Sequence, residues 1–207
     1  MMEILVVTED NEWQLVSLDQ LKVTTGKREV QQTASGFLSL NTAKTRAQLT
    51  TGHQRHVLLQ FRYRGQTPDP EPNQSGKVVE QIGVKLRTLN TCNVVYVMWR
   101  ITQPEGIVVK LKRNPGQSHH MECGANGYIS IAPSSQVPLT VTATDRRTHR
   151  LTVLMEDLDG VVQIAVQVDG EIVWTGEVAQ RLLECIDGPA GFRTDNGSFI
   201  FKMFIKP

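Results

Sequence analysis

Two Asp-Gly pairs divide the stretch from His149 to Thr175 into three short apolar runs, and this pattern constrains the fold more than any other feature of the sequence. Asp159-Gly160 and Asp169-Gly170 each supply the two positive-φ positions of a type I′ turn, whose twist matches that of the flanking strands. The runs between them are rich in β-branched residues, as strands are. The sequence therefore predicts a three-stranded antiparallel meander here.

The rest of the chain repeats this rhythm of short β-rich runs divided by Gly, Pro, Asn and Asp. Helical periodicity is confined to one short stretch, Val178–Cys185, and the Pro-rich segment Gln66–Lys77 is typical of a surface loop. Further strands are expected at Val57–Arg64, Gln81–Thr88, Asn93–Thr102, Ile107–Arg113, Tyr128–Ala132, Leu139–Ala143 and Ser198–Ile205. The pattern predicts an all-β fold, a two-sheet antiparallel jelly-roll sandwich, with residues 1–207 forming one domain.

Gln103-Pro104-Glu105-Gly106 is expected to join two of these strands in a hairpin, because Pro suits the second position of a turn. If Gln103 pairs with Gly106, one face of the hairpin is uniformly apolar and should be core. Its members are Val94, Tyr96, Met98, Ile107, Val109 and Leu111. Trp99 then lies on the opposite face beside Lys110 and Lys112. We therefore expect that second face to be open to solvent or to a ligand.

Charge and cysteine content narrow the classes of function. The 207 residues include 22 basic and 21 acidic side chains, a formal charge of +1, which argues against a nucleic-acid ligand. Cys92, Cys123 and Cys185 cannot all pair within one chain. A reducing, cytoplasmic setting is expected from the sequence as written, with one bridge plus a free thiol left open, and a secreted setting if a leader was removed. Met1–Glu9 does not resemble a signal peptide, and no apolar run is long enough for a membrane helix.

The C-terminal third carries motifs that resemble a known superfamily. The motifs are His149-Arg150-Leu151, Val166-Gln167-Val168-Asp169-Gly170, Gly188-Pro189-Ala190-Gly191-Phe192-Arg193-Thr194-Asp195-Asn196 and the last strand Phe199–Ile205. They are similar to the closing half of concanavalin A-like glucanase/lectin and laminin-G-like domains, and especially to bacterial sandwiches grouped with 3-keto-disaccharide hydrolases. The resemblance implies the same sandwich fold, with Gly188–Asn196 as a corner that leads into the last strand. The simplest role of Arg193 and Asp195 is an ion pair that locks this corner. It covers the N-terminal half by strand rhythm alone, and the Glu-x-Asp-x-x-Glu motif of the laminarinase-like branch is missing.

The leading functional hypothesis is a carbohydrate-binding sandwich whose ligand lies on a sheet face. Sugar rings stack on indole through their C–H faces, and their hydroxyls accept and donate hydrogen bonds to charged groups. The residues expected to bind the ligand are Trp99, Arg100, Lys110, Lys112, His119, His120 and Glu122. The sequence does not indicate the oligomeric state.

Two other classes remain open. One is a sugar-processing hydrolase or lyase of the same fold, with Glu122 as acid/base and His119 or His120 assisting. The other is a structural or self-association module without a small ligand. We assign no catalytic residue, since no motif of a known catalytic centre is present.

No metal site and no cofactor is predicted. His119-His120-Met121-Glu122-Cys123 contains suitable ligand types, but neighbouring side chains in an extended loop point in opposite directions, and no second ligand cluster follows at a recognised spacing. A structural calcium at Glu156, Asp157 and Asp159 is left open against the alternative of solvated turn carboxylates.

Overall fold

The structure, a computed structural model, describes residues 13–26, 30–73, 75–102 and 104–206. Met1–Glu9, on which the leader prediction rests, and Gln103 of the expected hairpin turn lie outside the described residues.

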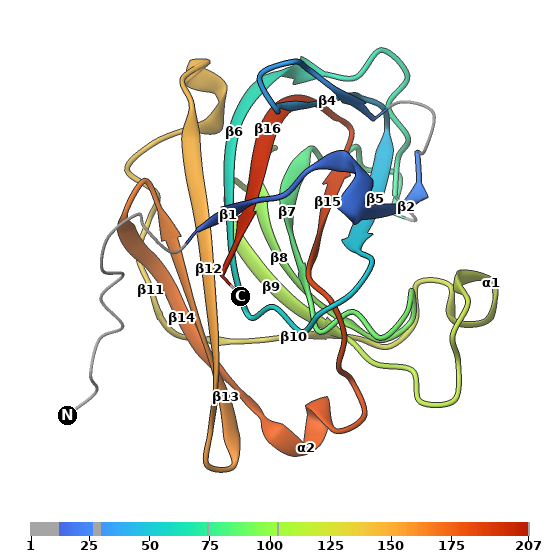
Figure 1. Cartoon of the computed structure of the whole chain (residues 1–207). Helices are drawn as coiled ribbons and strands as arrows, with labels where there is room; N and C mark the ends of the chain where they lie inside the picture. The colour runs from blue at the N-terminus through green and yellow to red at the C-terminus, as the bar shows by residue number, and fades with distance from the viewer. Residues whose placement is uncertain (1–12, 27–29, 74, 103, 207) are drawn as a thin grey trace.

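The chain folds into two antiparallel sheets that pack face to face (Figure 1). Over the described residues the larger sheet has nine strands in the order β11-β14-β13-β12-β6-β16-β4-β3, with β1 pairing to β16. These strands are β1 (Gln14–Leu15), β3 (Gln31–Gln32), β4 (Leu38–Asn41), β6 (His56–Gln66), β11 (Pro133–Gln136), β12 (His149–Leu158), β13 (Val161–Val168), β14 (Glu171–Ala179) and β16 (Gly197–Ile205).

The smaller sheet has seven strands in the order β10-β9-β8-β7-β15-β5-β2, again over the described residues. They are β2 (Leu21–Thr25), β5 (Lys44–Leu49), β7 (Gln81–Leu86), β8 (Val94–Arg100), β9 (Gly106–Lys112), β10 (Tyr128–Ser130) and β15 (Gly191–Asp195). Helical segments are short: η2 (Leu18–Gln20), α1 (His120–Cys123), η4 (Ala143–Asp145) and α2 (Gln180–Leu183). The predicted all-β, two-sheet sandwich is confirmed.

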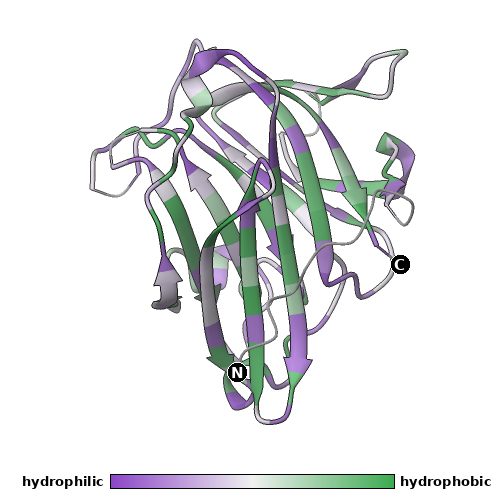
Figure 2. Cartoon of the chain, turned by 90° about the vertical axis from the view of Figure 1, so that its left-hand side faces the viewer, coloured by the Kyte–Doolittle hydropathy of each residue, from purple (hydrophilic) through white to green (hydrophobic). Residues whose placement is uncertain are grey.

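The core lies between the two sheets and follows from alternation along the strands. In β16 every second residue from Gly197 to Ile205 is buried, and Figure 2 shows hydrophobic and hydrophilic residues alternating along many strands. Side chains of a strand point to opposite faces in turn, so a period of two places one apolar set between the sheets. The core is thus built from inward-facing residues of both sheets.

The predicted meander is confirmed. β12, β13 and β14 pair in sequence order, with Asp169 in the left-handed region at φ 51° and Gly170 at φ 92°, as a type I′ turn requires. At the other pair Gly160 has a positive φ of 76° but Asp159 does not, so the turn between β12 and β13 is not of type I′. The predicted helix Val178–Cys185 is shorter, because β14 continues to Ala179.

Two expectations about strands are wrong. Residues Leu139–Ala143 form no strand; they cross from β11 to the short helix η4 along an irregular path. Gly191–Asp195, expected as a corner before the last strand, is itself the strand β15. It pairs with β5 on one side and β7 on the other, in the interior of the seven-stranded sheet.

The face assignment of the β8–β9 hairpin is right for Ile107, Val109 and Leu111, which lie in the main core, but wrong for the residues of β8. Arg100 pairs with Gly106 and Trp99 with Ile107, so the connection is longer than the turn that the sequence suggested. Changing the register by an odd number of residues exchanges the two faces of a strand. Val95, Val97 and Trp99 therefore face the main core, whereas Val94, Tyr96 and Met98 form a separate cluster on the opposite side of the sheet.

A disulfide joins Cys92, just before β8, to Cys123 of α1, with the two Cα atoms 5.9 Å apart. Cys185 is a free, exposed thiol. Of the alternatives that the sequence left open, the structure has one bridge plus a free thiol. The bridge holds the loop that carries α1 against the start of β8.

Candidate functional site on the outer face of the seven-stranded sheet

The face of the seven-stranded sheet that points away from the core carries basic and aromatic side chains. The strand register brings them together: Arg193 on β15 lies between Arg46 on β5 and Gly83 on β7, and Lys85 on β7 lies beside Tyr96 on β8. We call this surface the outer face. Its polar and aromatic members are Tyr128, Ser130, Lys110, Lys112, Tyr96, Arg100, Gln81, Lys85, Arg193, Asp195, Lys44, Arg46, Gln48 and Lys22.

A carboxylate held by two arginines lies at one end of the outer face. Arg193 Nε donates to Asp195 Oδ2 at 2.7 Å, and Arg46 Nη2 lies 3.2 Å from Asp195 Oδ1. Gln81 Nε2 adds a third hydrogen bond at 2.6 Å. Burial raises the pKa of Asp195, but the two guanidinium groups outweigh burial and hold that pKa below its usual value. The ion pair expected between Arg193 and Asp195 is therefore present.

Lys85 is a buried cation beside this group. Its side chain is 2% exposed, and its ammonium donates to Gln48 Oε1 at 3.3 Å. Burial lowers the pKa of Lys85 to about 7, and the positive charges of Arg46 and Arg193 lower it further in the same direction. Lys85 is thus divided between its charged and neutral forms near neutral pH.

Two tyrosines continue the outer face toward its β10 edge. Tyr96 and Tyr128 have ring centroids 6.2 Å apart, and the Arg193 guanidinium lies 4.9 Å from the centre of the Tyr96 ring. Tyr128 is 38% exposed, and the ammonium groups of Lys110 and Lys112 lie 5.9 and 5.3 Å from its ring centre. Tyr128 is thus a partly exposed aromatic ring with two ammonium groups over it.

The ammonium group of Lys112 is bound by backbone carbonyl groups. Its ammonium donates to the carbonyl oxygens of Gly124 at 2.7 Å and Thr91 at 3.3 Å, and it lies 3.2 Å from Cys123 Sγ. Burial lowers the pKa of Lys112, with Arg193 and Arg46 acting in the same sense. Lys110, by contrast, is partly exposed at its outward position. Lys110 is therefore the better placed of the two to contact a ligand.

Trp99 does not lie on the outer face, which corrects the expectation from sequence. Its indole is fully buried between the sheets, 5.3 Å from the Phe61 ring in an edge-to-face contact, and Nε1 donates to Glu105 Oε1 at 3.2 Å. The ring fills the core because the longer hairpin connection places it opposite Ile107. A sugar cannot stack on it.

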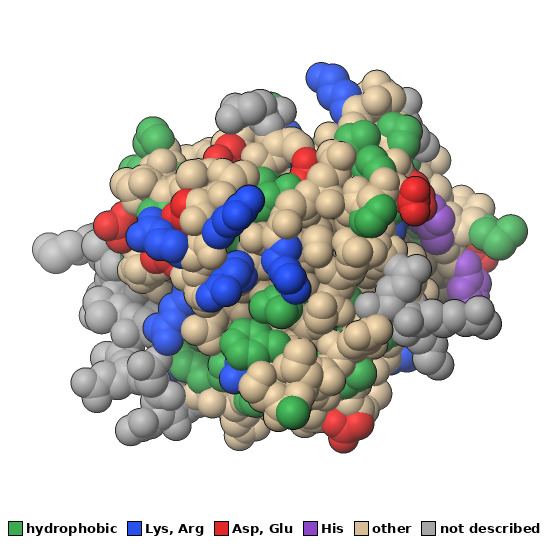
Figure 3. All heavy atoms as spheres, turned by 90° about the horizontal axis from the view of Figure 1, so that it is seen from above, with side chains coloured by type: hydrophobic (Ala, Val, Ile, Leu, Met, Phe, Trp, Pro, Cys, Tyr) green, Lys and Arg blue, Asp and Glu red, His purple; other side chains and the backbone are tan. Residues whose placement is uncertain are grey.

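The other sequence-predicted residues lie at the border of the outer face. Arg100 occupies an outward position at the end of β8, partly exposed. His119, His120 and Glu122 are exposed on and beside α1, and Figure 3 shows histidine side chains at the right-hand edge, the side on which α1 projects in Figure 1. Burial lowers the pKa of His120, and the charges of Lys112, Arg46, Lys44 and Arg193 lower it further, so this imidazole lies within the positive field of the outer face.

Glu122 acts as a cap for α1. Its carboxylate accepts hydrogen bonds from the backbone amides of Ser118 at 2.7 Å and His119 at 3.1 Å. Both bonds lower the pKa of Glu122, and the bond from the His119 amide has the larger effect. A general acid must hold its proton near neutral pH, so this arrangement disfavours the acid role that the enzyme alternative gives to Glu122.

Asp157 is bound to an arginine side chain. Asp157, one of three residues considered for calcium, accepts two hydrogen bonds from Arg87 Nη2 at 2.8 and 2.9 Å. Within the described part of the chain, no group of three or more His, Cys, Asp or Glu side chains is arranged to hold a metal ion.

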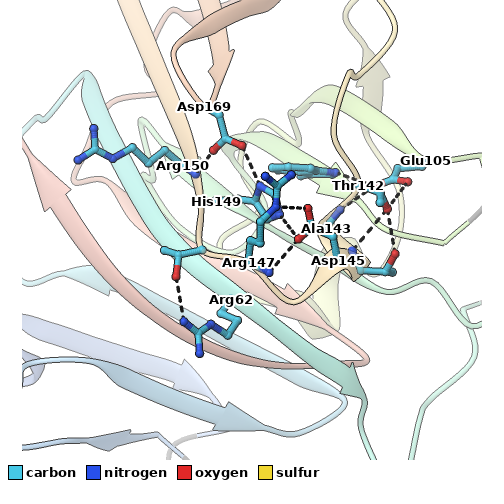
Figure 4. Close-up of polar contacts among 12 residues, drawn as sticks. Arg62, Glu105, Thr142, Ala143, Asp145, Arg147, His149, Arg150 and Asp169 are labelled. Carbon is cyan, nitrogen blue, oxygen red and sulfur yellow. Dashed lines mark hydrogen bonds and ion pairs between the residues drawn. The ribbon is translucent and has the colours of Figure 1, made fainter.

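A second polar cluster surrounds the buried His149 where β12 begins (Figure 4). His149, 1% exposed, places Nδ1 2.8 Å from Asp169 and Nε2 2.9 Å from Asp145. Glu105 lies nearby and accepts from the Ala143 amide at 3.2 Å. The cluster ties the Asp-Gly turn of the meander and helix η4 to the first residue of β12, so we assign it a structural role. It also shows that two of the C-terminal motifs contact each other.

Sequence reasoning missed Lys85, Arg46, Tyr96 and Tyr128 as members of the candidate site. A signal was present in Lys44-Thr45-Arg46-Ala47-Gln48, where polar and small residues alternate as in a half-buried strand. The alternation gives the face, but not which strands lie beside each other.

Comparison with solved structures identifies proteins that share the fold. Lectin II from Ulex europaeus matches with a TM-score of 0.53 and 7% identity, over 96% of this chain and 99% of that one. The Emp46p carbohydrate recognition domain matches with a TM-score of 0.51 and 12% identity, over 97% and 93%. The GH43 protein BlXynB from Bacillus licheniformis matches with a TM-score of 0.52 and 11% identity, over 97% of this chain.

The chain spans 38% of the length of the GH43 protein. No protein-family model matches the sequence, and no curated protein matches it significantly. At these identities the likeness shows the fold alone. Among the described residues, no helix combines the length and apolar character needed to cross a bilayer.

Proposed function

We propose that this chain, whose fold is the concanavalin A-like sandwich, binds a carbohydrate on the outer face of its seven-stranded sheet. The observation that carries the proposal is the exposed ring of Tyr128, flanked by Lys110 and Lys112 on the β9 strand beside it. This is the combination of aromatic platform and basic hydrogen-bond donors first expected around Trp99, formed instead by a residue of the neighbouring strand.

The chemistry of a sugar fits this surface. A pyranose ring can lie on Tyr128 through its apolar C–H face, while its hydroxyl groups meet charged donors at the ring border. Lys110 and Arg193 are the partly exposed cations nearest that border, and the Arg193 Nη1 lies 3.5 Å from the Tyr128 hydroxyl. Arg100, His119, His120 and Glu122 would contact a longer ligand at the edges of the face.

Names of structural relatives support the same class of ligand. Lectin II from Ulex europaeus and the carbohydrate recognition domain of Emp46p share the fold over nearly their whole length. The GH43 protein is the relative that favours the hydrolase alternative. The pKa of Glu122, lowered by two backbone amides, disfavours the role of acid that this alternative gives to Glu122.

Replacement of Tyr128 tests the proposal. We expect the wild-type chain to bind at least one oligosaccharide on a glycan array, and Tyr128→Ala to weaken that binding about tenfold or more in calorimetry. Ile129→Ala is the matched control, because Ile129 is similarly exposed on the same strand but points the other way. Binding that survives Tyr128→Ala unchanged, or that falls equally in Ile129→Ala, contradicts the proposal.

We also propose that the chain works in an oxidising compartment. Disulfides persist in secreted and periplasmic settings and are rare in the cytosol. The Cys92–Cys123 bridge thus favours the secreted alternative over the cytoplasmic one. The mass of the protein isolated from its native source, alkylated with and without prior reduction, checks this: cysteines 92 and 123 should react only after reduction.

A further inference from the structure

The outer face carries more positive charge than its own acidic residue can neutralise. Among the outward positions in the described strands of the seven-stranded sheet, Asp195 is the acidic residue. Its carboxylate is shared by Arg46 and Arg193. Lys85 lies beside the same pair and has a neutral partner, Gln48. When Lys85 is charged, its ammonium therefore adds a third positive charge near the two arginines in a largely buried setting.

Such an arrangement is costly without a further anion. Like charges close together repel one another, and burial removes the water that would screen them. Burial, with the charges of Arg46 and Arg193 acting in the same direction, lowers the pKa of Lys85 to about 7. Arg46 and Arg193 keep their charges and remain partly exposed, with side-chain exposures of 21% and 17%. An anion arriving at the two guanidinium groups would find donors in the planar geometry that suits a carboxylate or sulfate.

We propose that Arg46 and Arg193 form a subsite for an acidic group of the bound glycan, and that Lys85 beneath them takes up a proton when this group binds. The inference rests on the proposed function and names its class of ligand: a polysaccharide bearing carboxylates or sulfates. Tyr128 and the subsite share Arg193, which reaches the Tyr128 hydroxyl, so a sugar ring on Tyr128 and an acidic group on the arginines belong to one ligand.

Ligand choice provides the first test. Calorimetry compares galacturonate oligosaccharides, heparin oligosaccharides and neutral oligosaccharides of equal length with wild-type protein. We expect one acidic series to bind at least about tenfold more tightly than the neutral one. Lys85→Met should remove most of that preference, whereas Lys202→Met, a lysine on an outward position of the other sheet, should not.

The dependence of affinity on pH provides the second test, because Lys85 is the group that titrates near pH 7. Charged and titratable groups facing it or sharing its surface are Arg46, Arg193, Asp195, Tyr96, Tyr128, Arg100, Lys22, Lys44, Lys110, Lys112 and His120. The lowered pKa of His120 places its titration below this range, and the raised pKa of Tyr96 places its titration above. Burial also lowers the pKa of Lys112, so the Lys85→Arg variant is needed to assign the pH dependence to Lys85. Affinity for the acidic sugar should be constant below pH 7 and decrease up to pH 9, with proton uptake visible in buffers of different ionisation enthalpy.

Lys85→Arg is the matched control for the pH test, since its charge does not titrate in this range. It should bind the acidic sugar with an affinity that changes less than about twofold from pH 7 to pH 9. A wild-type profile equally flat overturns the role of Lys85. Circular dichroism of each variant checks that a change in binding does not come from unfolding.

The outcomes separate the inference from the proposed function. Equal affinity for neutral and acidic oligosaccharides, lost in Tyr128→Ala, overturns the acidic subsite and leaves carbohydrate binding in place. Inorganic sulfate binding as tightly as the acidic sugar, with no effect of Tyr128→Ala, supports the anion subsite and contradicts carbohydrate binding. Absence of binding to every probe overturns both.

Discussion

The position of Trp99 changes the consequence expected from its replacement. The indole is fully buried in the main core against Phe61, and its Nε1 satisfies Glu105. Trp99→Ala should therefore decrease the free energy of unfolding by about 3–5 kcal/mol, since it removes a large ring and leaves a cavity. Urea denaturation followed by circular dichroism measures this. The exposed Tyr128 is the comparison: Tyr128→Ala should change the stability by less than about 1 kcal/mol.

A Trp99→Ala protein as stable as the wild type would mean that the indole is not part of the core. That result would restore the original assignment of Trp99 to a solvent-facing surface.

The ionisation of Asp145 makes the stability of the protein depend on pH. Burial raises the pKa of this carboxyl, but bonds from the Arg147 amide at 2.8 Å, from the Arg147 guanidinium at 2.7 Å and from His149 at 2.9 Å outweigh it and hold the pKa at about 2. A carboxyl whose pKa is lower in the folded state stabilises the fold above its ordinary pKa of 3.8. That contribution is lost as the pH falls from about 4 toward 2.

Asp145→Asn tests this dependence. The variant should be less stable than the wild type at pH 6, and the difference between them should shrink as the pH falls toward 2, because protonation removes the same charge from the wild type. Urea denaturation at several pH values measures both proteins. A difference that stays constant over this range would show that the charge of Asp145 does not contribute.

Among the elements, the α1 loop depends on the disulfide more than on helix formation. α1 is a single turn, too short to be stable alone. The Cys92–Cys123 bridge closes a sequence separation of 31 residues and lies against the Lys112 ammonium. Cys92→Ser together with Cys123→Ser should decrease the free energy of unfolding by about 2–4 kcal/mol. Cys185→Ser, at an exposed free thiol, is the control and should have little effect.

Hydrogen exchange locates the effect of that double substitution. Amides of the loop around α1 should exchange faster, because the bridge no longer holds the loop to β8, whereas β12 and β13 keep their protection. Uniformly faster exchange over both sheets would instead show that the bridge stabilises the whole fold.

The β8–β9 hairpin shows why sequence patterns determine a strand more readily than its face. Both faces of this pair are apolar for much of their length: Val95, Val97 and Trp99 on one side, Val94 and Met98 on the other. Alternation along the strands therefore did not distinguish the two faces, and the assignment depended on the turn. One extra residue in the turn, or one fewer, exchanges the faces. The pairing of Trp99 with Ile107 places both side chains in the core, where they pack against the nine-stranded sheet.

At the scale of the molecule, the candidate site depends on strand order. Arg46, Lys85 and Arg193 come from strands β5, β7 and β15, and β15 lies between the other two although it is last of the three in sequence. Residues so far apart in the chain are brought together when the late strand pairs between the two early ones. A local pattern does not specify that pairing, since long-range partners are selected by packing of the whole sheet.

The sequence by itself determined the all-β character, the meander with its Asp-Gly turns and the sandwich fold. These features depend on interactions between residues close in the chain, that is turn geometry and alternation along a strand. The tertiary structure decided which face of β8 is core, placed Gly191–Asp195 as an interior strand, and gathered Tyr128, Lys85 and the two arginines on one surface. These depend on contacts between distant segments, whose free energy becomes available only when both sheets have assembled around a common core.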